Sequence, residues 1–138
     1  MGTIDMHVIA LDIKTGKKVW DVVTDDYKSE RTYNSGPLVV KDKVLMGAGN
    51  CGPGSANQHL GKVAGYSPPG GCFITGHDLE TGKELWRFNL GTPLKGSPVT
   101  FSVGAKQFVA VQGSGRHLHP VKYDKLEASS YLFVFALN

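Results

Sequence analysis

One segment of this sequence occurs twice, and the repetition limits the possible folds more than any other feature. The segment HVIALDIKTGKKVW, from His7 to Trp20, returns as FITGHDLETGKELW, from Phe73 to Trp86. Each copy reads as a β-strand, a turn in which Gly can adopt a positive φ while Asp caps the turn backbone, and a second strand that ends near Trp. Both copies therefore predict a β-hairpin.

A second pattern alternates with the first. Residues 36–47 and 97–111 each contain two short β-rich runs joined by a polar turn, Lys41-Asp42 in one case and Gly104-Ala105 in the other. The run from Leu132 to Asn138 repeats the first strand of the Trp-containing hairpin. In chain order, these segments predict two strands, then four, then three.

Four-stranded units with a Trp near the end of the last strand are typical of β-propeller blades, each of which needs a neighbouring blade to bury its faces. The predicted fold is all-β, a propeller fragment of about two blades. It comprises a half blade at 1–24, a full blade at 33–90 with a Gly/Pro-rich insert at 52–71, and a final blade at 95–138 that lacks its last strand. A β-sandwich also has short strands and Gly/Pro turns, but it does not require this unit to recur.

Composition and charge fit a globular protein rich in short elements. The chain has 138 residues, of which 41% are hydrophobic and 20% charged, and it contains 18 Gly and 7 Pro. Its net charge of +3 comes from basic residues scattered along the chain, so no nucleic-acid-binding face is expected. We also expect no membrane span, and the first residues lack the basic-then-apolar order of a signal peptide.

The two cysteines, Cys51 and Cys72, flank the Gly/Pro-rich insert. In an exported protein they would form a disulfide that closes the base of this loop, whereas in a cytosolic protein they would be two buried thiols. The cysteine count alone does not distinguish the two arrangements.

Several segments resemble blades of the PQQ-dependent (quinoprotein) alcohol dehydrogenases: ALDIKTGKKVW, GPLVVKDKV, TGKELWRF, KGSPVT and QFVAV. The resemblance covers nearly the whole chain. It implies part of an eight-bladed propeller in which such tryptophans dock blade against blade. It also implies PQQ near the axis beside Ca²⁺ or a lanthanide ion, an Asp as catalytic base, a cytochrome as electron acceptor, and a periplasmic location. Because other proteins use similar repeats without a quinone, the repeat supports the fold more than the chemistry.

By the same resemblance, residues 1–90 correspond to an early, continuous part of such an enzyme and residues 95–138 to its last blade. The blades between them are missing, and the junction follows the second Trp-containing hairpin. Loss of blades between homologous repeats leaves the strand register intact. A truncated or engineered chain explains the same arrangement.

The resemblance suggests five cofactor-binding residues: Asn34, Gly49, Asn50, Cys51 and Arg116. Gly49 to Cys51 corresponds to a loop that lies against PQQ, and Asn34 to a cofactor-facing Thr. Arg116 can pair with a quinone carboxylate. Ordinary structural interpretations stand beside these: Asn34 and Asn50 as turn residues, and Arg116 as an exposed loop residue.

Neither a catalytic nor a metal-binding residue is assigned to this chain. Relatives carry a metal-coordinating Glu in the loop that corresponds to 47–55, but residues 44–77 contain no acidic side chain. The family's catalytic Asp belongs to the missing blades. Four histidines lack a further ligand at suitable spacing, and we interpret them as loop or surface residues. They are His59, His77, His117 and His119.

We interpret the chain as a fragment of a quinoprotein alcohol dehydrogenase that is inactive by itself. The alternative is a non-catalytic propeller module for assembly or partner binding. Open blade edges predict a homo-oligomer or a closed, compact variant. Trp20 and Trp86 are predicted to be largely buried as docking residues of the core.

Overall fold

The computed structural model describes residues 1–29, 31–33, 35–49, 72–92, 94, 96–116 and 128–137, without the side chains of 114–116 and 128–129. A single turn of 3₁₀ helix, η1 (Tyr27–Ser29), accompanies the strands of this part of the chain. The strands are β1 (His7–Leu11), β2 (Lys18–Val23), β3 (Leu38–Val40), β4 (Lys43–Gly47), β5 (Phe73–Asp78), β6 (Glu84–Asn89), β7 (Val99–Val103), β8 (Lys106–Arg116) and β9 (Ala128–Leu137).

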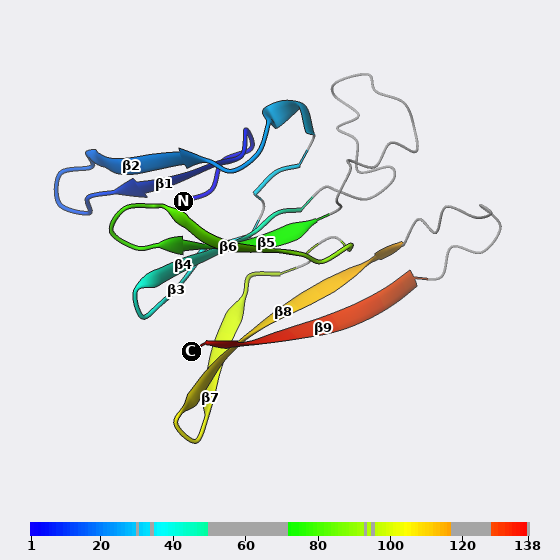
Figure 1. Cartoon of the computed structure of the whole chain (residues 1–138). Coiled ribbons are helices and arrows are strands. Elements are labelled where there is room, and N and C mark those ends of the chain that lie inside the picture. The colour runs from blue at the N-terminus through cyan, green and yellow to red at the C-terminus, as the bar shows by residue number, and fades with distance from the viewer. Residues whose placement is uncertain are drawn as a thin grey trace.

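The strands form three antiparallel sheets, and each sheet follows the chain order. The first sheet is β1-β2, the second is β3-β4-β5-β6 and the third is β7-β8-β9. The sequence repeats predict this succession of two, four and three strands, and the structure confirms it. Figure 1 shows the sheets one after another, with the first sheet at the top and the third at the bottom. No helix among the described residues is long and apolar enough to cross a membrane.

The turns of the Trp-containing hairpins have the chemistry that the sequence predicts. Gly16 and Gly82 adopt φ angles of 69° and 74°, which only Gly tolerates without strain. Asp12 and Asp78 each accept a backbone hydrogen bond from the Thr three residues further on. The two short hairpins also match expectation, because β3 pairs with β4 and β7 pairs with β8.

The hydrophobic core consists of two clusters, one between each pair of successive sheets. Alternation along the strands of the second sheet sends neighbouring side chains to opposite clusters. The cluster between the first and second sheets contains Met6, Val8, Tyr33, Val44, Met46, Ala48 and Phe73. The cluster between the second and third sheets contains Val40, Leu45, Ile74, Leu90, Leu94, Val109 and Val111. The second sheet is therefore the one described sheet covered on both faces.

One prediction about buried side chains is confirmed and another is wrong. Trp20 and Trp86 each pack against one of the two clusters and are mostly buried, as the repeat predicts. His77 is not a surface residue: it lies in β5 with 0% of its side chain exposed. Its neighbours on the same face belong to the first cluster, so alternation along β5 carries it inward.

Cys72, immediately before β5, is buried and disulfide-bonded. The only other cysteine of the sequence is Cys51, which lies outside the described residues together with the insert at 52–71. The disulfide alternative is therefore the one that the structure supports for Cys72.

Candidate functional site

Gly49, one of the predicted cofactor-binding residues, lies just beyond the end of β4. There the chain forms an isolated bridge with Thr32, the residue that precedes Tyr33 on the way into β3. The Gly49 N–H donates to the Thr32 carbonyl at 2.8 Å, and the Thr32 N–H donates back at 3.4 Å. Gly49 is buried, so this pair fixes the backbone at the start of the loop that follows β4.

The third sheet has a similar isolated bridge. Leu94, which precedes β7, pairs with Gly113 of β8, and Gly113 is buried as well. Gly49 lies beyond the end of β4, whereas Gly113 lies within β8, so the predicted loop from Gly113 to Arg116 is instead the end of a strand. Arg116 ends β8 and its backbone pairs with Ala128, while its side chain is outside the described residues.

Leu94 also links the second sheet to the third at this end. A Cβ added at Gly47, the last residue of β4, would overlap the Leu94 side chain. The Ser35 hydroxyl donates to the Gly47 carbonyl at 3.1 Å. Only Gly therefore lets the chain entering the third sheet approach so closely. We call this region, formed by Thr32, Ser35, Gly47, Gly49, Leu94 and Gly113, the glycine end of the sheets.

A similar contact joins the first sheet to the second. Gly2 bridges Val8 of β1, and a Cβ at Gly2 would lie 2.6 Å from the Cβ of Tyr33. Tyr33 and Leu94 each stand four residues before a proline that opens a short hairpin, Pro37 or Pro98. Neither Tyr33 nor Leu94 is among the residues predicted from the sequence, although their constant distance from the repeated prolines is a signal that could have identified them.

Buried polar groups connect the first and second sheets below the glycine end. The Tyr33 hydroxyl donates to Thr24 Oγ1 at 2.8 Å, and the Thr24 hydroxyl donates to the Met6 carbonyl at 2.8 Å. The Arg87 guanidinium donates to the Thr24 carbonyl at 2.7 Å. Burial raises the pKa of Tyr33, so this hydroxyl stays protonated and acts as a structural donor.

The charged groups of this interface are paired with one another. Arg87 donates to Glu84 at 2.7 and 3.0 Å, and the guanidinium carbon lies 4.1 Å from the centre of the Phe73 ring. The hydrogen bond to Glu84 raises the pKa of Arg87. Arg31 lies over the same ring at 5.6 Å and pairs with Asp25. Such pairing suits a structural contact better than a proton-transfer site.

His77 is held as a neutral structural residue. Because a carbonyl can only accept, His77 Nδ1–H donates to Gly82 O at 3.0 Å, and Nε2 accepts from the Thr75 hydroxyl at 2.9 Å. Burial lowers the pKa of His77. The ring therefore anchors the turn after β5 rather than binding a metal ion.

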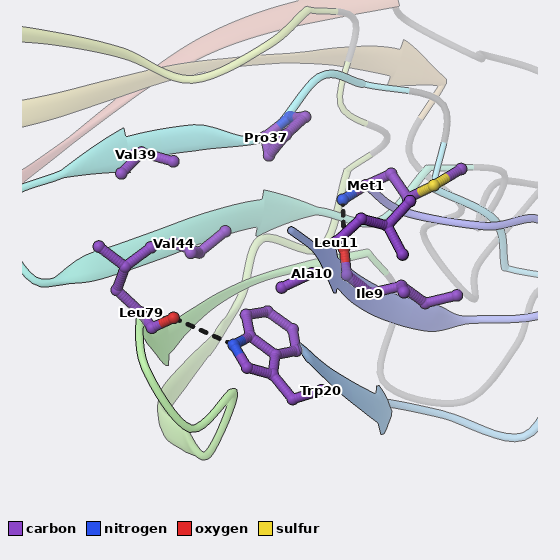
Figure 2. Close-up of a pocket in the computed structure, with 9 residues that line it drawn as sticks. All are labelled: Met1, Ile9, Ala10, Leu11, Trp20, Pro37, Val39, Val44 and Leu79. Atoms are coloured by element: carbon purple, nitrogen blue, oxygen red, sulfur yellow. Dashed lines mark hydrogen bonds between the residues drawn. The ribbon is translucent and has the colours of Figure 1, made fainter. Parts of the chain in front are cut away.

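A groove of about 340 Å³ opens between the first and second sheets. Trp20 lies along one side, and its indole N–H donates to the Leu79 carbonyl at 3.0 Å (Figure 2). The remaining lining is apolar: Met1, Ile9, Ala10, Leu11, Pro37, Val39 and Val44. A groove with this lining is a packing interface and offers no catalytic group.

The other predicted site residues lie outside the described part of the chain: Asn34, Asn50 and Cys51, with His59, His117 and His119. Within the described part, no group of three His, Cys, Asp or Glu side chains could hold a metal ion. The glycine end supplies backbone groups and hydroxyls, and none of its six residues carries the carboxylate that Ca²⁺ or a lanthanide prefers. We therefore derive no chemical step through a metal ion or a quinone.

Comparison with known proteins identifies the family to which this sequence is similar. Residues 7–109 match the model of the PQQ family, described as glucose/ethanol/alcohol dehydrogenase, β-propeller domain. Methanol dehydrogenase (cytochrome c) subunit 1 of Methylobacterium organophilum is 39% identical over 84 residues, 61% of this chain and 11% of the relative. Quinohemoprotein alcohol dehydrogenase ADH IIB of Pseudomonas putida is 38% identical over 88 residues, 64% of this chain and 11% of the relative.

Solved structures give the same result for the fold. Quinohemoprotein alcohol dehydrogenase ADHIIG of Pseudomonas putida HK5 aligns with a TM-score of 0.57 at 23% identity, over 80% of this chain and 19% of that one. The enzyme of Comamonas testosteroni aligns with a TM-score of 0.52 at 21% identity, over 78% and 19%. Repeats, sheets and comparisons agree that this chain is a fragment of a β-propeller and belongs to the PQQ family of glucose, ethanol and alcohol dehydrogenases.

Proposed function

We propose that this chain forms part of the propeller of a PQQ-dependent alcohol dehydrogenase, whose complete protein oxidises a primary alcohol and transfers the electrons to a cytochrome. The family match over residues 7–109 carries the proposal. The names of the relatives support it, because they include cytochrome c methanol dehydrogenases and quinohemoprotein alcohol dehydrogenases. PQQ and Ca²⁺ or a lanthanide are the cofactors proposed for the parent. The family match supports PQQ, and a lanthanide-dependent methanol dehydrogenase of Methylacidiphilum fumariolicum, 36% identical over 86 residues, supports a lanthanide.

In this proposal the glycine end contributes a wall of the cofactor site. The backbone from Gly49 to Cys51 would face the quinone, Asn34 would offer a polar contact, and Arg116 would pair with a quinone carboxylate. The bridge between Gly49 and Thr32 supports this role, since it fixes the backbone immediately before Asn50. PQQ would supply the redox chemistry, and these residues would orient it and exclude water.

A periplasmic location belongs to the same proposal. The disulfide at Cys72 supports it, because disulfides persist in oxidising compartments such as the bacterial periplasm. The expected cytochrome acceptor is consistent with that compartment. Mass spectrometry of the protein purified from cells under alkylating conditions should find Cys72 unmodified, and an alkylated Cys72 would contradict the periplasmic assignment.

By itself the chain is expected not to turn over alcohols. Oxidation of an alcohol requires a positioned base and an electrophile that stabilises the developing charge. Several described acidic residues are held in other contacts: Asp12 and Asp78 in turns, Asp25 with Arg31 and Glu84 with Arg87. A dye-linked assay with PQQ, Ca²⁺ or a lanthanide and short primary alcohols should give no turnover. A rate above about 1 s⁻¹ that chelation abolishes would show a complete site.

A non-catalytic propeller module is the second candidate, favoured by the paired state of these acidic groups and by the exposed apolar face of the third sheet. The two candidates differ in their affinity for the quinone. Titration of PQQ with Ca²⁺ should give a saturable absorbance change, weakened by Arg116→Ala, if the chain retains the cofactor wall. Absence of saturation would favour the module over the cofactor wall.

A further inference from the structure

Two contacts attach the chain that enters β3 to the end of β4. The Thr32 backbone bridges Gly49, and the Ser35 hydroxyl donates to the Gly47 carbonyl at 3.1 Å. We call residues 31–36, which include both contacts, the entry segment. Because it holds the backbone where the loop after β4 begins, the position of the entry segment determines the position of Gly49.

Tyr33 ties the entry segment to the first sheet. Its side chain is 6% exposed, and its N–H donates to the Thr3 carbonyl at 3.4 Å. Its hydroxyl donates to Thr24 Oγ1 at 2.8 Å, and the Thr24 hydroxyl donates to the Met6 carbonyl at 2.8 Å. Both hydroxyls of this path therefore have an acceptor, and the path ends on the backbone of the first sheet.

The third sheet shows that packing alone does not require this hydroxyl. Leu94 stands four residues before Pro98, as Tyr33 stands four residues before Pro37, and it is 3% exposed. It fills the space between two sheets with an apolar side chain. Burial of a hydroxyl costs free energy that its hydrogen bond offsets only in part. What the Tyr33 hydroxyl adds over Leu is a contact with a fixed direction.

This directed contact lies directly behind the proposed cofactor wall. In the sequence, Tyr33 stands between Thr32, which bridges Gly49, and Asn34. Gly49 and Asn34 are both predicted to bind the cofactor. A binding site keeps its geometry when the residues behind it are locked by packing and by hydrogen bonds. Tyr33 has both, because it is buried in the cluster between the first two sheets and bonded to Thr24.

We propose that Tyr33 is a positioning residue for the quinone site, whose hydroxyl, held by Thr24, fixes the backbone of Thr32 and Gly49. The role rests on the proposed function, since that function places the quinone at the glycine end. It also gives a task to the first sheet, which carries none of the predicted cofactor-binding residues. That sheet orients the wall from behind, without contact to the quinone.

The first test measures amide hydrogen exchange by NMR, without any cofactor. Tyr33→Phe removes only the hydroxyl, so the Gly49 amide, which donates to the Thr32 carbonyl, should exchange about three- to tenfold faster. The Leu90 amide is also hydrogen-bonded at this end of the second sheet and should keep its rate. The matched control Tyr27→Phe removes an exposed hydroxyl and should change neither rate.

Variants of Thr24 test the same contact from the other side. Thr24→Val should accelerate exchange of the Gly49 amide at least as much as Tyr33→Phe, and adding Tyr33→Phe should then have no further effect. Thr24→Ser keeps the hydroxyl and should retain the slow rate. Circular dichroism checks folding, and Thr24→Val decides the matter if Tyr33→Phe unfolds. Unchanged exchange at Gly49, or equal acceleration at Gly49 and Leu90, would overturn the positioning role.

Titration of PQQ with Ca²⁺ then tests the link to the cofactor. Tyr33→Phe should raise the dissociation constant about three- to tenfold and shift the absorbance of the bound quinone, whereas Tyr27→Phe should leave both unchanged. Saturable binding that Tyr33→Phe does not weaken would overturn the role toward the quinone. Absence of binding to the unaltered chain would refute the cofactor wall itself, while the exchange rates decide separately whether Tyr33 holds Gly49.

Discussion

The two copies of the Asp-Thr-Gly turn, at 12–17 and 78–83, share one conformation but have different surroundings. In each turn the Gly N–H donates to the Asp carbonyl, at 2.8 Å in the first copy and 2.9 Å in the second. The Asp carboxylate accepts from the Thr hydroxyl in both. The Asp, Thr, Gly and Lys that the two turns share therefore determine a turn that does not depend on the rest of the fold.

The surroundings of the two glycines differ completely. Gly16 has open space where a Cβ would be, whereas a Cβ at Gly82 would lie 2.6 Å from the Trp20 ring. In the second turn, the Leu79 carbonyl accepts a hydrogen bond from the Trp20 indole N–H (Figure 2). The Gly82 carbonyl accepts one from the His77 ring. The repeated sequence therefore forms the same turn twice. Only the turn at 78–83 is contacted by another hairpin, because Trp20 of β2 packs against it.

Replacement of Gly16 and Gly82 by alanine should separate the cost of backbone strain at positive φ from the cost of displacing the Trp20 ring. Gly16→Ala should cost about 1 to 2 kcal/mol in unfolding free energy, from the positive φ alone. Gly82→Ala should cost about 2 to 4 kcal/mol, because displacement of the Trp20 ring adds to the same strain. Urea unfolding measures both variants. Equal losses would mean that Trp20 does not dock on the second turn.

The two tryptophans provide the next comparison. Trp20→Phe removes the hydrogen bond to Leu79 and should cost about 0.5 to 1.5 kcal/mol more than Trp86→Phe. Among the described residues, the Trp86 indole N–H has no acceptor, and its ring packs against Phe135 with centres 6.0 Å apart. Urea unfolding of both variants measures the difference. A larger loss of unfolding free energy for Trp86→Phe than for Trp20→Phe would show that the hydrogen bond from Trp20 to Leu79 does not contribute as expected.

Local features of this fold could be predicted from the sequence, and contacts between sheets could not. The turns at Gly16 and Gly82 depend on residues a few positions apart, so their repetition predicts them. The contact of Trp20 with the second turn depends on how the second sheet lies against the first. At the candidate site, the cofactor role of Gly49 stays a prediction from the family resemblance. The spacing of Leu94 from Pro98 repeats that of Tyr33 from Pro37, but this spacing does not reveal that Leu94 contacts Gly47 of another sheet.

His77 makes the second turn sensitive to pH, whereas the corresponding residue of the first copy is Leu11. Burial holds the folded-state pKa of His77 below its ordinary value of 6.5. Its contribution to stability is therefore present above pH 6.5 and is lost as the pH falls toward the lowered pKa. Unfolding free energies between pH 7.5 and pH 5, compared with those of His77→Gln, measure this contribution. If the unfolding free energy of His77→Gln depended on pH in the same way as that of the unaltered chain, His77 would not be the source of the pH dependence.

The smallest effects are expected at the turn carboxylates, where the two copies should behave alike. The hydrogen bond from the Thr15 or Thr81 hydroxyl holds the pKa of Asp12 or Asp78 below the usual value of 3.8. Stability from either group is present above that value and is lost as the pH falls through the lowered pKa. Thr15→Val and Thr81→Val should raise the respective pKa, measured by NMR titration. A response of one copy alone would show that the turns are not equivalent.

The most direct test of the account is a double-mutant cycle between Trp20 and Gly82. Its central claim is that a tryptophan of one sheet docks on the glycine turn of the next, as in successive blades of a propeller. Trp20→Ala should abolish the extra penalty of Gly82→Ala, which gives a coupling of about 1 to 3 kcal/mol, while Gly16→Ala with Trp20→Ala should be additive. Additivity of Trp20→Ala and Gly82→Ala within about 0.5 kcal/mol would contradict the claim.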